Sequence, residues 1–391
     1  MSSIELENVY KIFGKEPEKA IQLIEEGKNK EEIQKETGQV VGVRGITFSI
    51  KENELFVIMG LSGSGKSTLL RCVNRLVEPT RGKIVLNANG DSYDVAKVDS
   101  ETLKKLRKTQ MSMVFQNFAL FPYRNVIDNI AFGLEIQGVS EKERNRKAKE
   151  LIEMVGLEGF GNSYPPELSG GMQQRVGLAR GLATGADILL MDEPFSALDP
   201  LIKVEMQDEL INIMEEMKRT VLFVTHDLDE ALKLGDRITI MEAGKMVQKG
   251  TPEEIIVNPK TKYVENFVDN ADPSDVLRAS TIATKEFQAG DDQRVHLNDN
   301  TELKLDNEGQ VEKGYIGQET VSIKSLENLE GSTDKKNIIS VHPDTAISKV
   351  MKARLNHSTL PVILLENKKL VGYITEKNIL HGLLEKGREN I

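Results

Sequence analysis

The chain has 391 residues, of which 39% are hydrophobic and 29% are charged, a composition typical of a soluble globular protein with two or three domains. Its formal net charge of -10 argues against nonspecific nucleic-acid binding, so we expect no nucleic-acid partner. One cysteine, Cys72, excludes an internal disulfide and fits a reducing compartment. Neither a membrane-spanning apolar run nor a signal peptide is evident, so work at a membrane would need a membrane-spanning partner chain.

The predicted elements follow one another in a regular order from the N-terminus. A strand and a turn end at Phe13-Gly14, and the charged insertion that follows, at about 15–40, is expected to form one or two short surface helices. The segment ELFVIMG then predicts a buried strand that ends at Gly60. Further short apolar strands alternate with helical patterns, which predicts an α/β fold with a largely parallel sheet covered by helices.

The character of the sequence changes in a polar stretch with two prolines at about 258–275. Such a stretch is typical of a domain boundary. We therefore expect a first domain at 1–265 and a smaller α+β domain at 276–390.

The segment GLSGSGKST, residues 60–68, lies between a predicted buried strand and a predicted helix and fits the phosphate-binding pattern G-x-x-x-x-G-K-[ST]. Its glycines let the backbone wrap a phosphate chain, so that N–H groups and the helix N-terminus point at negative charge. Lys66 can reach the β- and γ-phosphates, and the hydroxyl of Ser67 can ligate Mg²⁺. This segment predicts nucleotide binding.

Two further strands are predicted to end in residues suited to catalysis. The strand ILLM ends in Asp192-Glu193, at the kind of strand end where α/β sites gather. Asp192 suits a contact with Mg²⁺, and Glu193 could orient and deprotonate the attacking water as general base. Alternatively, this dipeptide only starts a loop. His226 follows the strand VLFVT and is expected at the same sheet edge, although a single histidine there is more often structural than catalytic.

The segment LSGGMQQR, residues 168–175, places one Ser and two Gly directly before a helical stretch. It predicts a second anion-binding helix N-terminus, although a segment of this kind is by itself most often only a helix cap. Two phosphate cradles far apart in one domain suggest that each nucleotide is held by both, one from each of two subunits.

Together with Gln116 and the segments ILLMDEP and SALD, these motifs resemble the full set of an ATP-binding-cassette (ABC) ATPase over about residues 1–257. The resemblance implies a P-loop NTPase with a RecA-like core and antiparallel β and α-helical subdomains. It implies a head-to-tail homodimer that holds two ATP molecules between the phosphate-binding loop of one copy and LSGGMQ of the other. It also implies a peripheral ATPase at the cytoplasmic face of the membrane, whose partners are permease subunits and a solute-binding protein or domain.

The resemblance assigns a role to each matching residue. The catalytic residues would be Glu193, His226 and Lys66. The Mg²⁺ ligands would be Ser67, Gln116 and Asp192. The residues that bind ATP, drawn from both copies, would be Phe13, Gly60, Ser62, Gly63, Ser64, Gly65, Lys66, Ser67, Thr68, Gln116, Ser169, Gly170, Gly171, Gln173 and Asp199. The stretch 118–122 would meet the membrane subunit.

The insertion at about 15–40 and the segments EPTRGKI and SALDPLIKVEMQDEL are similar to those of importers for glycine betaine, proline betaine or carnitine. The chain would then power import of a quaternary-ammonium osmoprotectant. Two alternatives are the ATPase of another ABC importer, for an amino acid such as methionine, and a non-transport ABC ATPase. The second usually carries a long coiled-coil insertion or two cassettes in one chain, and the sequence shows neither. The intact residues Lys66 and Glu193 argue against a third alternative, a catalytically dead cassette.

The C-terminal part contains a weak internal repeat, because Gly-Tyr-Ile occurs at 314–316 and again at 372–374. Coincidence explains a three-residue match about as well. The part resembles a tandem cystathionine-β-synthase-type (CBS) module, with a degenerate first copy at 276–330 and a clearer second copy at 335–390. The resemblance implies regulation, by cyclic di-AMP or another adenosine nucleotide. Asn378 stands where the family usually has a ribose-binding Asp, so a purely structural role stays equally open.

Overall fold

The computed structural model divides into two compact units, Met1–Thr251 and Pro252–Ile391. The residues that it describes are 3–88, 90–196, 198–269, 271–287, 290, 292–329, 336–358 and 360–385. Ala197, which belongs to the predicted segment SALD, lies outside them. In the described part of the chain, every helix is too short or too polar to cross a membrane.

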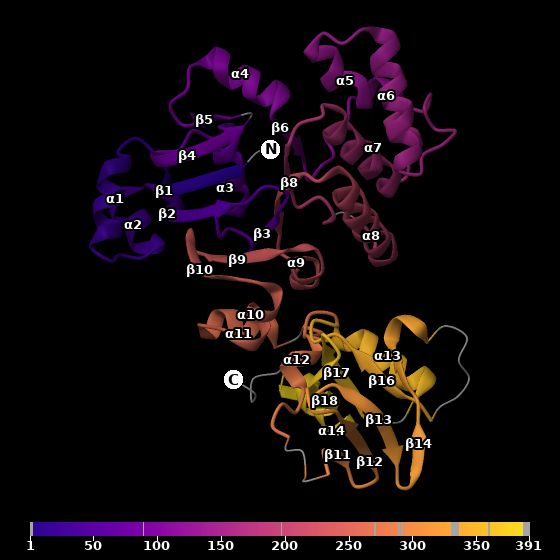
Figure 1. Ribbon diagram of the computed structural model, residues 1–391. Helices are drawn as coiled ribbons and strands as arrows, with labels where there is room; N and C mark the ends of the chain where they lie inside the picture. Colours follow the sequence, from indigo (N-terminus) through magenta and orange to yellow (C-terminus); the bar gives the residue numbers. More distant parts are fainter. Residues whose placement is uncertain are drawn as a thin grey trace. The chain divides into compact units, whose positions relative to one another are not determined.

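The first unit contains two sheets (Figure 1). The smaller sheet is antiparallel, with the strand order β2-β1-β4-β5. The larger sheet has the order β10-β9-β3-β8-β7-β6. The strands β9, β3, β8, β7 and β6 are parallel to one another, and the edge strand β10 is antiparallel to β9. The strands are β1 (Ser3–Phe13), β2 (Val40–Ile50), β3 (Leu55–Met59), β4 (Arg81–Ala88), β5 (Asp91–Asp94), β6 (Met111–Val114), β7 (Ile188–Asp192), β8 (Thr220–Thr225), β9 (Arg237–Glu242) and β10 (Lys245–Gly250). This arrangement confirms the predicted α/β fold with a largely parallel sheet.

In the first unit α3, α4 and α9 contact strands of the parallel sheet and α8 packs beside α9, α1 and α2 lie against β1 and β2, and α5, α6 and α7 form a separate group (Figure 1). That group corresponds to the expected helical subdomain. The helices are α1 (Pro17–Glu25), α2 (Lys30–Thr37), α3 (Lys66–Val73), α4 (Ser100–Thr109), α5 (Val126–Gln137), α6 (Glu141–Met154), α7 (Gly170–Ala183), α8 (Pro200–Met217) and α9 (Leu228–Leu234), with a 3₁₀ turn η1 (Pro165–Glu167).

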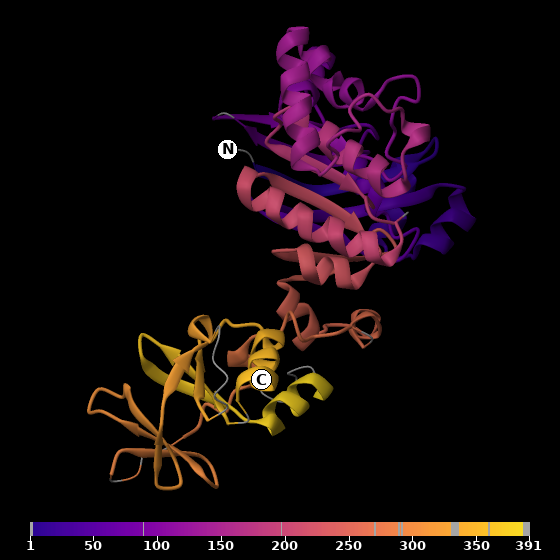
Figure 2. The same ribbon diagram turned by 90° about the vertical axis from the view of Figure 1, so that its right-hand side faces the viewer.

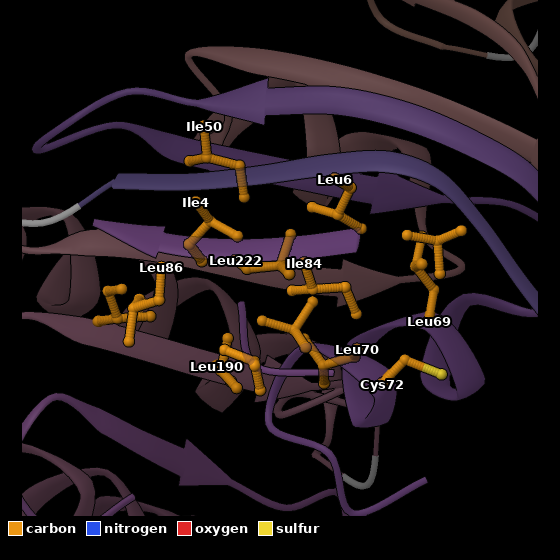
Figure 3. Packing of buried hydrophobic residues seen from close by; sticks show 14 of the residues in the cluster. Ile4, Leu6, Ile50, Leu69, Leu70, Cys72, Ile84, Leu86, Leu190 and Leu222 are labelled. Carbon is orange, nitrogen blue, oxygen red and sulfur yellow. The ribbon is translucent and has the colours of Figure 1, made fainter. Parts of the chain in front are cut away.

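The main core of the first unit lies between the two sheets and around α3 (Figure 3). Ile4 and Leu86 come from the antiparallel sheet, Leu190 and Leu222 come from the parallel sheet, and all four are almost fully buried. Leu70 of α3 packs into the same cluster. Because α3 directly follows the phosphate-binding loop, this apolar packing fixes the position of the loop.

The charged insertion forms two helices, α1 and α2, as predicted. They are not only a solvated surface, because Ile21 and Ile33 are buried in a small cluster with Ile12 and Val41 of the adjoining strands. Asn29 caps α2 through a capping box, which satisfies backbone N–H groups of the first turn. The insertion is therefore a folded cap on the end of the β1–β2 hairpin.

The second unit combines two four-stranded sheets that share one apolar core. One sheet has the order β11-β12-β13-β14 and is antiparallel, and the other has the order β15-β16-β17-β18. Its elements are α10 (Pro252–Val257), α11 (Lys262–Val268), α12 (Ala279–Ile282), β11 (Arg294–Asn298), β12 (Thr301–Leu305), β13 (Val311–Ile316), β14 (Glu319–Val321), β15 (Ile323–Ser325), η2 (Leu326–Asn328), β16 (Ile338–Val341), α13 (Ile347–His357), β17 (Val362–Glu366), β18 (Lys369–Ile374) and α14 (Glu376–Glu385). In Figure 2 the orange strands of the first sheet lie beside the yellow strands and helices.

Two sequence-based expectations for the tail differ from what is observed. The polar stretch at 258–275 contains the helix α11, and the compact units divide earlier, after Thr251. The expected first copy at 276–330 contains the short helix α12, the antiparallel strands β11 to β14, the strand β15, which pairs in parallel with β16, and the turn η2. Its described residues contain no counterpart to the long helix α13 of the second copy. The two Gly-Tyr-Ile motifs do occupy similar places, each in the second strand of a hairpin.

Candidate active site

Four neighbouring strands of the parallel sheet carry the predicted catalytic motifs at their carboxyl ends. β3 leads into the phosphate-binding loop, β8 into His226, β7 into Asp192-Glu193, and β6 is followed closely by Gln116. These strands are adjacent in the order β3-β8-β7-β6, and β3, β7 and β8 are buried along their whole length. Parallel strands end at the same edge, so segments far apart in sequence meet there.

The phosphate-binding loop depends on glycine at two positions. Gly65 has φ +102°, and a Cβ there would lie 2.2 Å from the carbonyl oxygen of Gly42 in β2. Gly60 has φ +153°, and its Cβ would lie 2.3 Å from the carbonyl oxygen of Met241. Any other residue at either position would force the loop away from its neighbours.

Lys66 begins the helix after the loop and is only 4% exposed. Its Nζ donates to the carbonyl oxygens of Gly60 (2.8 Å) and Leu61 (3.2 Å) and lies 3.5 Å from Oε1 of Glu193. Burial lowers the pKa of Lys66, and the nearby Glu193 carboxylate opposes part of that change. The ammonium group is thus held at the base of the loop, beside the carboxylate.

Glu193 is the meeting point of the site. Its Oε2 lies 3.0 Å from Nδ1 of His226 and 3.4 Å from the amide nitrogen of Gln116, and its Oε1 faces Lys66. Its backbone has φ +46°, a left-handed conformation that is uncommon for a non-glycine residue and is concentrated at functional sites. The hydroxyl of Ser196 donates to the Glu193 carbonyl oxygen at 3.0 Å and so helps to fix this turn.

Asp192 is 1% exposed and makes an ion pair at 3.0 Å with Arg71, which lies one turn beyond Ser67 on α3. That contact uses Oδ2 only, and Oδ1 is buried without a hydrogen-bond partner among the described residues. A buried carboxylate oxygen with no donor fits a cation ligand. The candidate metal ligands are a carboxylate oxygen of Asp192, the hydroxyl of Ser67 and the side-chain amide oxygen of Gln116. All are oxygen atoms, which Mg²⁺ prefers.

The second predicted phosphate cradle is built elsewhere in the first unit. Ser169 caps α7 by accepting a hydrogen bond from the N–H of Met172 at 3.3 Å, and Gly170 is exposed beside it. The side chain of Gln173 donates to Leu168 at the start of this segment. Among the described residues, no hydrogen bond or ion pair joins this segment to the phosphate-binding loop.

Phe13 and Asp199 lie on the surface around the two cradles. The ring of Phe13 is 42% exposed, and both it and Thr68 of the loop helix lie against Gly42. An aromatic face is therefore available next to the phosphate-binding loop. Asp199 is exposed and caps α8 by accepting from the N–H of Ile202. The polar side chains of Ser62, Ser64 and Ser67 lie along the loop itself, where that of Ser64 is buried.

Several residues that support the site were not predicted from the sequence. Arg71 holds Asp192, and Lys203 binds the carboxylate of Asp227 beside His226 at 2.6 Å. Ser196, predicted only as the first residue of the segment SALD, accepts from the side-chain amide of Gln116 at 3.3 Å. Of these residues, Arg71 had the clearest signal in the sequence, because it is a lone cation inside the apolar stretch TLLRCV.

Comparison with known proteins agrees with this geometry. A family model described as ABC transporter matches residues 43–196, and one described as CBS domain matches residues 333–385. Among solved structures, a dimeric bacterial ABC transporter cassette is 32% identical with a TM-score of 0.53, over 64% of this chain and 98% of that one. The chain therefore contains an ABC ATPase, which hydrolyses ATP, and a C-terminal CBS domain.

Curated relatives match over nearly the whole chain. The glycine betaine/carnitine transport ATP-binding protein of Listeria monocytogenes is 45% identical over 394 residues, with 98% of each chain covered. The glycine betaine/proline betaine transport system ATP-binding protein of Escherichia coli is 42% identical over 399 residues, with 99% of each covered. The chain belongs to this family of ABC transporter ATP-binding proteins for glycine betaine, proline betaine and carnitine, which confirms the resemblance found in its sequence.

Proposed function

We propose that the chain powers import of a quaternary-ammonium osmoprotectant across the cytoplasmic membrane by hydrolysing ATP, as a peripheral subunit on the cytoplasmic face. The observation that carries the catalytic part is the position of Glu193, whose carboxylate faces Lys66, Gln116 and His226 at once. The transport part is supported by the full-length relatives, which are named for glycine betaine with carnitine or proline betaine.

In this proposal Glu193 is the general base. Its carboxylate orients a water molecule toward the γ-phosphate and accepts the proton from it. His226 lies beside the same carboxylate and contacts the γ-phosphate, and Lys66 contributes positive charge to the phosphates as charge builds up in the transition state. The N–H groups of the loop at 60–68 hold the phosphate chain, and the ring of Phe13 stacks on adenine.

The residues proposed to hold Mg²⁺ are Ser67, Gln116 and Asp192. When bound, the ion would neutralise charge on the β- and γ-phosphates. The buried, unpartnered Oδ1 of Asp192 supports this assignment, because a desolvated carboxylate oxygen is costly unless a cation or a donor meets it. Arg71 keeps the carboxylate oriented through the other oxygen.

We further propose that two copies form a head-to-tail dimer and that Ser169, Gly170, Gly171, Gln173 and Asp199 of one copy complete the ATP site of the other. The separation of the two phosphate cradles within one chain supports this arrangement, as does the dimeric state of the similar cassette structure. ATP then favours the closed dimer because its γ-phosphate makes contacts there that ADP cannot make.

The proposed partners are membrane-spanning permease subunits and a solute-binding protein or domain. The loop at 118–122 is the proposed contact with the permease. It is held by Arg180, which donates to the carbonyl oxygens of Phe118 and Ala119 at 2.6 Å each. Tyr123 beside it is 93% exposed, which fits a surface that a partner covers.

The CBS domain is proposed to regulate the ATPase, with cyclic di-AMP or another adenosine nucleotide as candidate ligand. Asn378 favours a structural role for its own position, because its side chain accepts from the N–H of Thr375 at 2.9 Å and donates to Thr284 at 3.2 Å. Titration of the full chain with cyclic di-AMP tests this point, and an unchanged melting temperature and no heat of binding would remove the nucleotide-sensor proposal.

The catalytic proposal is tested by Glu193→Gln. Removing a general base is expected to lower the turnover of ATP by about 100-fold or more. Nucleotide binding should persist, because the phosphate-binding loop is unchanged, and ATP should trap a dimer on size-exclusion chromatography. Glu216→Gln, an exposed carboxylate on α8, is the control. Unchanged hydrolysis in Glu193→Gln would contradict the role of Glu193.

The transport proposal is tested with the permease that co-purifies with this chain. The reconstituted complex is expected to take up labelled glycine betaine, proline betaine or carnitine in an ATP-dependent manner. Uptake of methionine without uptake of any of these would instead support the amino-acid importer, and hydrolysis with no associated permease would support a non-transport ATPase.

A further inference from the structure

The charged insertion has no role in the catalytic scheme above, yet its ends adjoin the nucleotide site. It forms the loop of the β1–β2 hairpin, in which Phe13 and Val40 are paired at the two ends. Gln39 closes the base of this loop, because its Oε1 accepts from the N–H of Glu16. The insertion therefore starts at the residue proposed to stack on adenine, and its fold decides what else it contacts.

The helix α2 of the insertion reaches the phosphate-binding loop through Lys30. Its Nζ donates to the carbonyl oxygen of Gly63 at 3.3 Å. Lys30 is the first residue of α2, where a positive charge is unfavourable against the helix dipole. Among the described residues, Gly63 is the only hydrogen-bond partner of this amine. The capping box at Asn29 and the buried Ile33 hold the helix in the position that aims Lys30 at the loop.

The contact is one of several hydrogen bonds to the loop's backbone. Other carbonyl oxygens of the loop also accept hydrogen bonds: those of Gly60 and Leu61 from Lys66, that of Ser64 from the N–H of Gly244, and that of Gly65 from the N–H of Leu69. Gly63 has φ +76°, and nothing lies within 4 Å of the place where its Cβ would be, so side-chain packing does not fix it. Lys30 supplies the donor at this position.

We propose that Lys30 is a positioning residue for nucleotide binding: its bond to the Gly63 carbonyl oxygen holds the loop with its N–H groups toward the phosphate chain, and its charge lies beside that chain. This rests on the nucleotide site proposed above. Because the loop contacts the phosphates before and during hydrolysis alike, Lys30 contributes to binding of ATP and ADP and leaves the chemical step unchanged.

The test uses the full-length chain and Lys30→Met, which keeps the length of the side chain and removes the ammonium group. The dissociation constants of ATP and ADP are measured by fluorescence titration, and kcat and KM by phosphate release. Loss of one charge-assisted hydrogen bond is expected to raise Kd and KM about five- to tenfold with kcat changed less than about twofold. Lys30→Arg should restore most of the affinity.

Lys35→Met is the matched control, because Lys35 is an exposed lysine in the last turn of the same helix. It is expected to bind both nucleotides as the unchanged protein does. Equal affinity in Lys30→Met and the unchanged protein would overturn the proposal, as would an equal loss in both lysine variants. Lys66→Ala tests the proposed nucleotide site independently of Lys30. If Lys66→Ala abolishes nucleotide binding and Lys30→Met leaves it unchanged, the nucleotide site is supported and the role of Lys30 is contradicted. Comparable melting temperatures for all variants show that they are folded.

Discussion

Glu193 joins side chains from three different strand ends, and its backbone is strained where it does so. The neighbouring Asp192 is satisfied on one oxygen only. Two adjacent carboxylates thus have different surroundings, one beside the cation of Lys66 and polar side chains, the other buried against Arg71. This difference is the physical basis for giving them different roles, a base and a metal ligand.

Cys72, in contrast to these two carboxylates, is expected to be chemically unreactive in the folded protein. It is fully buried on α3, and burial raises the pKa of its thiol from the ordinary 9.0 to about 12. Only the thiolate attacks an electrophile. We therefore predict that N-ethylmaleimide labels the native protein far more slowly than the protein in denaturant and leaves ATP hydrolysis intact. Fast native labelling at neutral pH would contradict this.

The same shift has a consequence for stability. Above pH 9 the thiol ionises in the unfolded chain but stays protonated in the folded one, so the unfolded state gains stability as pH rises from 9 toward 12. Cys72→Ala should reduce this part of the alkaline loss, as measured by urea unfolding at pH 7.5 and 9.5.

At the scale of elements, an ion network links α8 to the segment of His226. Lys203 of α8 lies 2.6 Å from Asp227 and 2.7 Å from Glu230, and Glu230 also accepts from the hydroxyl of Thr225. Since Asp199 caps the same helix α8, the network connects a proposed dimer-interface residue with the turn that carries His226. Burial alone would raise the pKa of Asp227, but Lys203 and backbone N–H groups outweigh it and hold that pKa below its ordinary 3.8.

We predict that Lys203→Met lowers the free energy of unfolding by about 3 kcal/mol, because it leaves the buried Glu230 without its cation. The contribution of Asp227 has a defined pH window: it is complete above the ordinary pKa of 3.8 and is lost as pH falls below it. Stability curves from pH 3 to 7 should thus show a smaller acid-dependent loss in Lys203→Met. Lys218→Met, at the end of the same helix, is the control, and equal stability of the two variants would exclude the network.

At the scale of the whole molecule, the proposed catalytic unit is a pair of chains. Lys66→Ala damages the phosphate-binding loop and Ser169→Arg damages the second cradle, so each variant alone should be inactive. In a mixed dimer one site combines the two intact halves, and an equal mixture should regain at most about a quarter of the activity if pairing is random and the sites are independent. Complete inactivity of the mixture at every ratio, with dimers present, would argue for sites contained within single chains.

Much of the active site was predictable because its chemistry is carried by short segments. Glycines that need positive φ, a lysine before a helix, and carboxylates after an apolar strand are local properties, and the strands β3, β7 and β8 that place them read as continuous apolar runs. That the ends of those strands share one edge of the sheet followed from a general rule on parallel sheets, whereas their order in the sheet did not. The ion pairs of Arg71 and Lys203 were not predicted, because the sequence of a helix does not show whether a cation faces solvent or a particular carboxylate.

The sequence by itself determined the nucleotide-binding motif, the alternation of strands and helices, and the presence of a charged insertion at about 15–40. Only the tertiary structure decided that Lys30 of this insertion meets Gly63 and that Glu193 gathers Lys66, Gln116 and His226. It also gave the segment at 276–330 its antiparallel sheet, which the weak Gly-Tyr-Ile repeat did not predict. The physical reason is the separation of the residues along the sequence. Backbone preference and apolar periodicity depend on residues close together in the sequence, whereas these contacts depend on which strands lie side by side in the fold.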